Sequence, residues 1–287
     1  MNLSEIILNI QELEILCKNA SSQKLSGAFK SYTKGRGLVL DSVRKYEIGD
    51  DIRDVNWNAT ARFQETYINA FIEDKAHTIW LLVDISRSGV FGTEIKNKFA
   101  LSVEIVAAMS YSAIESKNLV GVIFFSDNIH SVIPPARGAT HFWRIAKALV
   151  TLQPSGKGTN LANAMQYLLK INPKQSVVYV VSDFITTNYK PLAKILAHCH
   201  ELTAIHVYDE GECNFPKVSW AKLKDSETGS RTWANTAINK FQNNYRKHHQ
   251  THLEDLKLFF TQNNSRFLSI HTGENCIERL ITFMREV

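Results

Sequence analysis

From residue 78 onward, short apolar runs alternate with longer segments of helical periodicity, and this alternation constrains the fold more than any other feature. The apolar runs are "TIWLLVD" (78–84), "LVGVIFF" (119–125), "SVVYVVSD" (176–183), "LTAIHVYD" (202–209) and "RFLSIHT" (266–272). Segments with helical spacing lie at 94–117, 140–152, 161–170, 191–199, roughly 234–262 and 276–287. Runs of this length suit strands buried on both faces, which helical crossovers between parallel strands require. The sequence therefore predicts an α/β fold with a mostly parallel sheet and helices on both sides.

The chain before this region has a different character. Apolar residues at helical spacing predict an amphipathic helix over residues 3–19, and residues 38–75 resemble extended structure with turns at "EIGDD" and around "NWNATAR". We therefore expect two parts, an N-terminal helix with a β-rich extension over 1–75 and an α/β domain over 76–287. A stretch near 212–234 interrupts the alternation and predicts a hairpin insertion with its turn at "DSETG".

Composition argues against several classes of protein. The net charge of +5 over 287 residues is mild and gives no reason to expect nucleic-acid binding. No stretch approaches the roughly 20 apolar residues that span a bilayer, and the start of the chain lacks the features of a signal peptide. The four cysteines form no C-x-x-C pair. These features predict a reduced, cytoplasmic protein without a membrane span.

Oxygen-bearing side chains follow three of the predicted elements at the edge of the sheet where ligands bind in α/β folds. They are Asp84, Ser86 and Ser88 after the first apolar run, Thr159 in "GKGTNLANA", and Asp183 at the end of "SVVYVVSD". Together they could surround one hard cation, and an acidic side chain of another protein would complete its coordination. The alternative is that these residues only cap turns and helices.

The order "DISRS", "GTN", "VSD" on alternating strands resembles the metal-ion-dependent adhesion site of von Willebrand factor A domains. The resemblance covers residues 76–287. It implies direct ligation by the hydroxyls of Ser86, Ser88 and Thr159, with Asp84 and Asp183 acting mostly through water. It implies a divalent cation, first of all Mg²⁺, with Mn²⁺ and Ca²⁺ as alternatives.

A second motif precedes the α/β domain and is dense in charges of both signs. Its residues are Arg44, Tyr46, Asp50, Asp51, Arg53, Asp54, Trp57 and Arg62. One interpretation is a hairpin whose charges pair with each other and with the neighbouring domain, where exposed pairs contribute little stability. The other interpretation is a docking surface for a partner protein.

The pattern R-x-Y-x-x-G-D-D-x-R-D-x-x-W-x-x-x-A-R closely resembles the signature of the bacterial family known as domain of unknown function 58. The similarity runs over nearly all of residues 30–287. It implies a von Willebrand A-like domain and a partnership with MoxR-type AAA+ ATPases, and it implies no biochemical activity.

Enzyme activity is the minority interpretation. An aspartyl phosphotransferase with Asp84 as nucleophile would carry a second acid two residues later, where this chain has Ser86. A serine hydrolase would need G-x-S-x-G, and "PSGKGTN" lacks the G-K-[ST] order of a phosphate loop. We therefore expect a non-catalytic, metal-dependent module that captures an acidic client protein. The alternatives are a metal-free scaffold that binds through residues 30–75 and a metal-dependent hydrolase or phosphotransferase.

Overall fold

The computed structural model describes residues 33–73, 77–90, 97–156, 158–186, 188–213, 221–224, 231–234, 236 and 239–285. The predicted helix over residues 3–19 and the predicted turn at "DSETG" (225–229) lie outside these residues. None of the described helices is long and apolar enough to cross a membrane.

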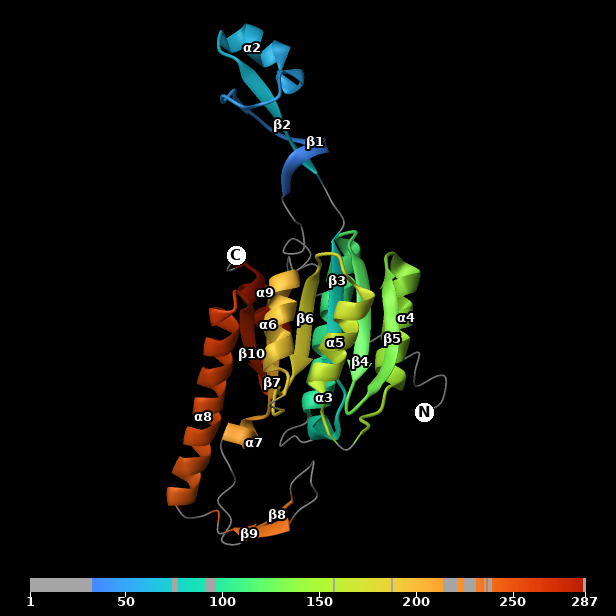
Figure 1. Cartoon of the computed structure of the whole chain (residues 1–287), viewed down its shortest axis with the longest axis vertical. Coiled ribbons are helices and arrows are strands. Elements are labelled where there is room, and N and C mark those ends of the chain that lie inside the picture. The colour runs from blue at the N-terminus through green and yellow to red at the C-terminus, as the bar shows by residue number, and fades with distance from the viewer. Residues whose placement is uncertain are drawn as a thin grey trace.

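The centre of the molecule is a six-stranded sheet with the strand order β10-β7-β6-β3-β4-β5 (Figure 1). Its strands are β3 (Thr78–Asp84), β4 (Leu119–Phe125), β5 (Ile129–Ala136), β6 (Val177–Ser182), β7 (Glu201–Tyr208) and β10 (Arg266–His271). All pairs are parallel except β4 with β5, which is antiparallel. This arrangement confirms the predicted α/β fold with a mostly parallel sheet.

Helices cover both faces of the sheet, as the continuous apolar runs predict. They are α3 (Lys98–Glu115), α4 (Ala139–Thr151), α5 (Leu161–Ile171), α6 (Lys190–Cys199), α8 (Asn239–Gln262) and α9 (Cys276–Arg285). Along β3 the side chains alternate between two cores: Leu81 and Val83 pack with α3, α4 and α9, and Trp80 and Leu82 pack with α5, α6 and α8. Because both faces of β3 are buried, its sequence is apolar at every position from 79 to 83.

The strand order reverses beside β3. From β3 the chain moves outward through β4 and β5, and then returns to β6 on the other side of β3 and continues through β7 to β10. The reversal between β3 and β6 is a topological switch point, and ligands of open α/β sheets bind beyond the carboxyl ends of the strands at such a point. The candidate residues Asp84 and Asp183 follow these two strands.

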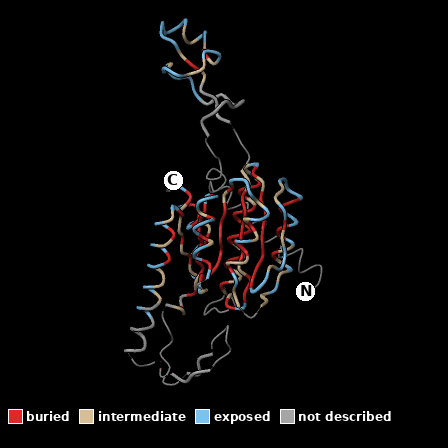
Figure 2. Tube along the Cα trace, in the orientation of Figure 1, coloured by how far each residue is buried: buried red, intermediate tan, exposed pale blue. Residues whose placement is uncertain are grey.

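Residues 33–73 form a separate arm, which joins the sheet at the amino end of β3 (Figure 1). It consists of the antiparallel strands β1 (Thr33–Lys45) and β2 (Tyr67–Glu73), the short 3-10 helix η2 (Ile52–Asp54) and the helix α2 (Trp57–Phe63). Among its described side chains, Val55 and Ile68 are the buried apolar ones, and most of the rest is exposed (Figure 2). The described side chains of the arm therefore bury little apolar surface.

Two elements differ from the sequence-based expectation. The expected turn around "NWNATAR" is the helix α2, where the Asn56 side chain accepts a hydrogen bond from Ala59 N at 2.9 Å and so caps the helix. The edge strand β5 is not predicted at all.

Strands β8 (Ala221–Lys224) and β9 (Arg231–Ala234) pair antiparallel within the stretch where we expect a hairpin insertion. The division of the chain near residue 75 stays a prediction.

Candidate functional site

The turn after β3 brings Asp84, Ser86 and Ser88 together. The backbone N–H of Ser86 donates to Asp84 Oδ1 at 2.9 Å, and the hydroxyls of Ser86 and Ser88 share a hydrogen bond of 2.7 Å. Both serines are buried, with exposed fractions of 3% and 6%. Neither serine caps the helix α3, because that role belongs to Asn97, whose side chain accepts from Ala100 N at 2.8 Å. Capping of α3 therefore does not explain these two serines, although Ser86 directly precedes the 3-10 helix η3 (Arg87–Val90).

The end of β6 adds a second carboxylate, that of Asp183, which is buried. The hydroxyl of Ser182 donates to Asp84 Oδ2 at 2.7 Å, which ties β6 to β3. The next residue, Asp183, accepts a hydrogen bond from the side chain of Ser88 and a longer one from Ile185 N at 3.4 Å. The serine of "VSD" is thus part of the site, although sequence analysis selected only the aspartate. Its signal is its position beside Asp183 at the strand end.

Phe184 holds the turn after Asp183 in an unusual backbone conformation. Its φ of 52° lies in the left-handed region, which is strained for a bulky side chain. The ring is buried and packs against Tyr189 and Phe260, with ring centroids 5.6 and 5.4 Å away. The backbone N–H of Phe184 donates to Ser182 Oγ at 3.1 Å. Aromatic packing therefore fixes the direction of the chain where it leaves Asp183.

Thr159 lies before helix α5 but does not cap it. The cap is Asn160, whose side chain accepts from Asn163 N at 3.0 Å. The backbone N–H of Asn160 donates to Ser126 O at 2.7 Å, which joins this loop to the end of β4. The Thr159 hydroxyl is buried and has no hydrogen-bond partner among the described residues. A buried hydroxyl without a partner costs free energy, so this oxygen fits a ligand that the chain itself does not supply.

A small cavity of about 20 Å³ lies at these strand ends. Its polar lining comes from Asp84, Ser86, Ser88, Lys98, Ser102, Ser182 and Asp183. A polar cavity needs roughly 10–15 Å³ to hold one water molecule. The space is therefore large enough for a single water or a single ion. Four of the five predicted metal ligands line it, and Thr159 does not.

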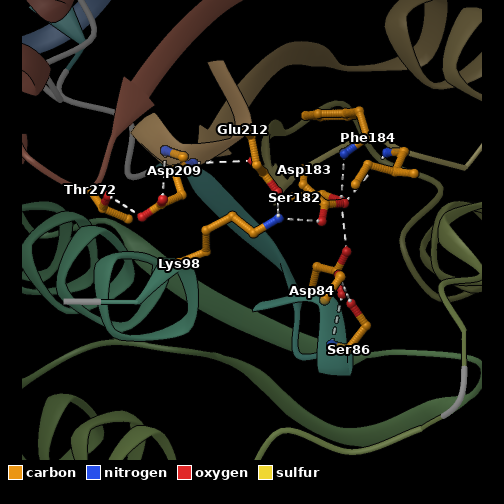
Figure 3. A network of polar contacts seen from close by, with 12 residues as sticks. Asp84, Ser86, Lys98, Ser182, Asp183, Phe184, Asp209, Glu212 and Thr272 are labelled. Carbon is orange, nitrogen blue, oxygen red and sulfur yellow. Dashed lines mark hydrogen bonds and ion pairs between the residues drawn. The ribbon is translucent and has the colours of Figure 1, made fainter. Parts of the chain in front are cut away.

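Lys98 is part of the site, and sequence analysis missed it. Its ammonium lies 3.0 Å from Asp183 Oδ2 and 2.6 Å from Glu212 Oε1, and the lysine side chain is only 3% exposed (Figure 3). Lysine in the first turn of an apolar helix gives no sequence signal for such a role, because lysine side chains usually reach solvent. Burial by itself would lower the pKa of Lys98, but the two carboxylates outweigh this effect and raise it.

The polar network continues to the ends of β7 and β10 (Figure 3). Glu212, in the short helix α7 (Glu210–Cys213), accepts a hydrogen bond from Asp209 N at 3.1 Å. The Asp209 carboxylate in turn accepts from the Thr272 hydroxyl at 2.7 Å. Polar contacts therefore run from Asp84 at the end of β3 across the carboxyl ends of β6, β7 and β10.

The carboxylates of Asp84 and Asp183 differ in the direction of their pKa shifts relative to the positive charge nearby. Burial and repulsion from Asp183 raise the pKa of Asp84 to about 7, although hydrogen bonds from Ser86 and Ser182 oppose this. Burial would also raise the pKa of Asp183, but the Lys98 ammonium dominates and lowers it. No Lys, Arg or His within the described parts of the chain forms an ion pair with Asp84. Among the described residues, Asp84 is therefore a half-buried carboxylate without a paired cationic side chain.

These features fit a hard divalent cation. Serine and threonine hydroxyls with two carboxylates make an all-oxygen donor set, which Mg²⁺ prefers. Over the described ranges, no three His, Cys, Asp or Glu side chains gather in a metal-binding arrangement, so a cation here would depend on the hydroxyls. The ion-sized cavity, the missing counter-charge of Asp84 and the unpartnered hydroxyl of Thr159 all agree with this chemistry.

The arm contains the charged motif, and some residues of this motif form hydrogen bonds with one another. Arg44 donates to Asp50 Oδ1 at 2.7 Å, and Asp50 Oδ2 accepts from Glu47 N at 2.9 Å. The Asp51 side chain accepts from Arg53 N at 3.0 Å and so caps η2. The first interpretation of this motif, charges that pair within the hairpin, therefore accounts for Arg44 and Asp50.

Other motif residues of the arm face solvent. Arg53, Asp54 and Arg62 form no ion pair with another described residue, and Trp57 is 70% exposed. Tyr46 is half-buried, and its backbone N–H donates to Thr66 O at 2.9 Å. Several large apolar side chains accompany them at the surface of the arm: Val43, Ile48, Ile52 and Phe63. In Figure 1 the arm lies beyond the amino end of β3, on the opposite side of the sheet from the strand-end site.

The family described as "Protein of unknown function DUF58" matches residues 42–255. Among similar sequences are two proteins described as uncharacterized, Rv1480 of Mycobacterium tuberculosis (strain ATCC 25618 / H37Rv) and Mb1516 of Mycobacterium bovis. Each is 28% identical over 223 residues, which cover 77% of this chain and 70% of the relative.

Similar solved structures include von Willebrand A domains. The conserved hypothetical protein BatB of Bacteroides thetaiotaomicron aligns over 74% of this chain and 100% of its own, with 12% identity and a TM-score of 0.46. The SpRpn10 VWA domain aligns over 72% and 94%, with 15% identity and a TM-score of 0.43. A von Willebrand factor type A protein of Catenulispora acidiphila aligns over 75% and 42%, with 10% identity and a TM-score of 0.40. Structural similarity with TM-scores of this size supports no conclusion about function. The fold is defined here by the strand order of the sheet.

Proposed function

The chain belongs to the DUF58 family, and we propose that it is a non-catalytic protein-interaction module that captures a carboxylate of a partner at a divalent cation. The observation that carries this proposal is the convergence of Ser86, Ser88 and the carboxylates of Asp84 and Asp183 on an ion-sized cavity at the topological switch point. A site for an organic substrate would need a larger cavity.

Each residue has a role in the proposed site. The hydroxyls of Ser86 and Ser88 would ligate the cation directly, and Thr159 would join them with its unpartnered hydroxyl. Asp84 and Asp183 would hold the water molecules that Mg²⁺ is reluctant to lose. The hydrogen bond from Ser182 keeps the Asp84 carboxylate directed at this position.

The partner in this proposal is an acidic protein. Neutral hydroxyl ligands leave most of the charge of a divalent cation uncompensated, and the bound cation would supply a point of attachment for a further carboxylate. Such a site favours a partner that offers an exposed Asp or Glu side chain. The same proposal includes a MoxR-type AAA+ ATPase as a second partner, as the family signature implies, with this chain as the adaptor between ATPase and client.

The test is capture of partner proteins in Mg²⁺ and in EDTA, with immobilised wild type beside Asp84→Ala. We expect proteins that bind the wild type only in Mg²⁺ and that the variant does not capture. The matched control is Asp255→Ala, which removes an exposed carboxylate on α8. Capture by Asp84→Ala at the wild-type level, with the variant folded by circular dichroism, would contradict the proposal.

A second candidate function is metal-free docking through the arm. The specific observation in its favour is the exposure of large apolar residues, with Ile48 102% and Ile52 and Trp57 each 70% exposed. Aromatic residues and arginine are enriched where protein interfaces have their strongest contacts, and Arg53 and Arg62 lie in the same segment. The brace between Arg44 and Asp50 closes the turn that presents Ile48. This surface would act independently of the cation site.

A further inference from the structure

Lys98 enters the strand-end site from the first turn of α3. Asn97 caps this helix, and Lys98 is its first residue, so the side chain starts beside the loop that follows β3. It extends to Asp183 and Glu212, where its ammonium makes contacts of 3.0 and 2.6 Å. The ammonium lines the same cavity as the hydroxyls of Ser86 and Ser88.

Burying an ammonium group costs free energy, and the ammonium of Lys98 lies between two carboxylates that offset this cost. Removing a charged group from water costs several kcal/mol, and only close pairing with carboxylates offsets that cost. Lys98 is paired in this way on two sides, by a strand-end carboxylate and by Glu212 of α7. Its contact is with Asp183, a carboxylate expected to serve the cation, and not with Asp84.

The contact with Asp183 places a positive charge in the immediate surroundings of the proposed cation. A monovalent charge a few Å from a divalent cation repels it, and in a buried site water screens this repulsion only weakly. The ammonium also occupies Asp183 Oδ2, an oxygen that could otherwise hold cation-bound water. In the structure, Lys98 therefore supplies part of the charge that a divalent cation would bring.

We propose that Lys98 is a tethered cation that competes with the divalent ion for Asp183 and so sets the affinity of the site for metal. This inference rests on the proposed cation site and deepens it. Lys98 is a positioning residue in this account, since it acts on the metal through Asp183. A weakened site would be filled mainly when the carboxylate of a partner adds its own charge, and this would make partner binding and metal binding depend on each other.

The test is calorimetric titration with Mg²⁺ and with Mn²⁺, without any partner. The variants are Lys98→Met, which removes the charge and keeps the length of the side chain, and the double variant Lys98→Met/Glu212→Gln. The double variant removes one charge of each sign, so the net charge of the site stays that of the wild type, and no second carboxylate is left uncompensated. The control is Lys147→Met, which removes an exposed lysine on α4.

We expect both Lys98 variants to bind Mn²⁺ at least about tenfold more tightly than the wild type, and Lys147→Met to match the wild type. Circular dichroism of each variant shows whether it is folded, and the double variant gives the answer if the single variant does not fold. A thermal melt gives a second readout, because Mn²⁺ should raise the melting temperature of the Lys98 variants more than that of the wild type.

The four outcomes separate this inference from the proposed function. Binding to the wild type, with tighter binding to the Lys98 variants, supports both. Binding to the Lys98 variants alone supports the inference and shows that the wild type does not bind the metal without a partner. Equal or weaker binding by the folded variants overturns the inference and leaves the cation site intact. Absence of binding to every chain overturns both.

Discussion

The Ser182 hydroxyl lies 2.7 Å from Asp84 Oδ2, so a single hydrogen bond joins the ends of β6 and β3 at the point where the strand order reverses. The same oxygen of Ser182 accepts from Phe184 N at 3.1 Å. One side chain thus fixes both a carboxylate of the site and the turn that follows Asp183.

Replacing this serine should weaken both the fold and the site. In Ser182→Ala, Asp84 keeps its hydrogen bonds from Ser86 but loses the one from the Ser182 hydroxyl, and Phe184 N loses its acceptor. Leaving a buried polar group unsatisfied costs about 1–3 kcal/mol. Urea denaturation should show a loss of this size, whereas Ser131→Ala, on the exposed edge strand β5, should be neutral. Equal stability of the two variants would contradict the role assigned to Ser182.

The left-handed backbone of Phe184 allows a comparison between two small residues at the same position. Phe184→Ala removes a buried ring that packs against Tyr189 and Phe260, and such truncations cost about 3–5 kcal/mol. Glycine is usually worse than alanine within ordered structure, but at a φ of 52° it avoids the steric penalty that alanine retains. We therefore expect Phe184→Gly to be at least as stable as Phe184→Ala in urea denaturation. A glycine variant about 1 kcal/mol less stable than the alanine variant would show that this backbone stores no strain.

His206 in β7 should make the protein less stable in mild acid. Burial is the main cause of its low pKa of about 3; Asp183 opposes the shift, and His252 and His249 add to it. An unfolded histidine has a pKa near 6.5, so below that pH the unfolded chain binds more protons than the native one. The stability that the neutral imidazole contributes is therefore present above about pH 6.5 and is lost as the pH falls toward 3. At its steepest, the loss is about 1.4 kcal/mol per pH unit.

The measurement is the free energy of unfolding between pH 7 and pH 4.5 for wild type and His206→Phe. Phenylalanine keeps a ring beside Tyr208 and Phe267 and does not titrate. The difference between the two curves isolates His206 from Asp84, whose raised pKa acts in the opposite direction. Parallel curves would mean that His206 is not a source of acid sensitivity.

The arm should tolerate loss of its exposed apolar residues without loss of stability. Trp57→Ala and Ile48→Ser remove side chains that contact mainly solvent, so the free energy of unfolding should change by no more than about 0.5 kcal/mol. If the arm docks a MoxR-type ATPase, both variants should reduce its capture at least about tenfold, in Mg²⁺ and in EDTA alike. The matched control is Trp143→Ala, which removes an exposed tryptophan from α4. Equal loss of capture in the control would show that the arm has no special role.

The fold could be predicted from the sequence where a strand is buried on both faces. Trp80, Leu81, Leu82 and Val83 form a continuous apolar run in β3, and β4, β6 and β7 are likewise buried along most of their length. Strand β5 was not predicted from the sequence because it lies at the edge of the sheet, where exposed residues and the pair Pro134–Pro135 interrupt the apolar pattern. Helix α2 was not predicted because it has no buried residue to give an apolar pattern. Its ends depend on the Asn56 cap and on Gln64, whose backbone is left-handed.

The candidate site could be predicted only in part, for a related reason. Asp84, Ser86, Ser88 and Asp183 lie together because strand ends in a parallel sheet meet at one edge, a rule that needs no coordinates. Lys98 could not be predicted, because its burial depends on how closely α3 approaches the ends of β6 and β7. In the same way, nothing in "DEGEC" indicates that Glu212 turns back toward a lysine more than a hundred positions earlier.

The central claim is that the strand-end hydroxyls bind a divalent cation, and its most direct test is calorimetric titration of the wild type and Ser86→Ala with Mg²⁺ and Mn²⁺. Ser86→Ala removes one proposed ligand and leaves the backbone hydrogen bond to Asp84 in place. The account predicts one saturable site in the wild type that is lost or strongly weakened in Ser86→Ala and retained in Ser131→Ala. Equal binding by all three chains, or no binding by wild type and Lys98→Met alike, would contradict it.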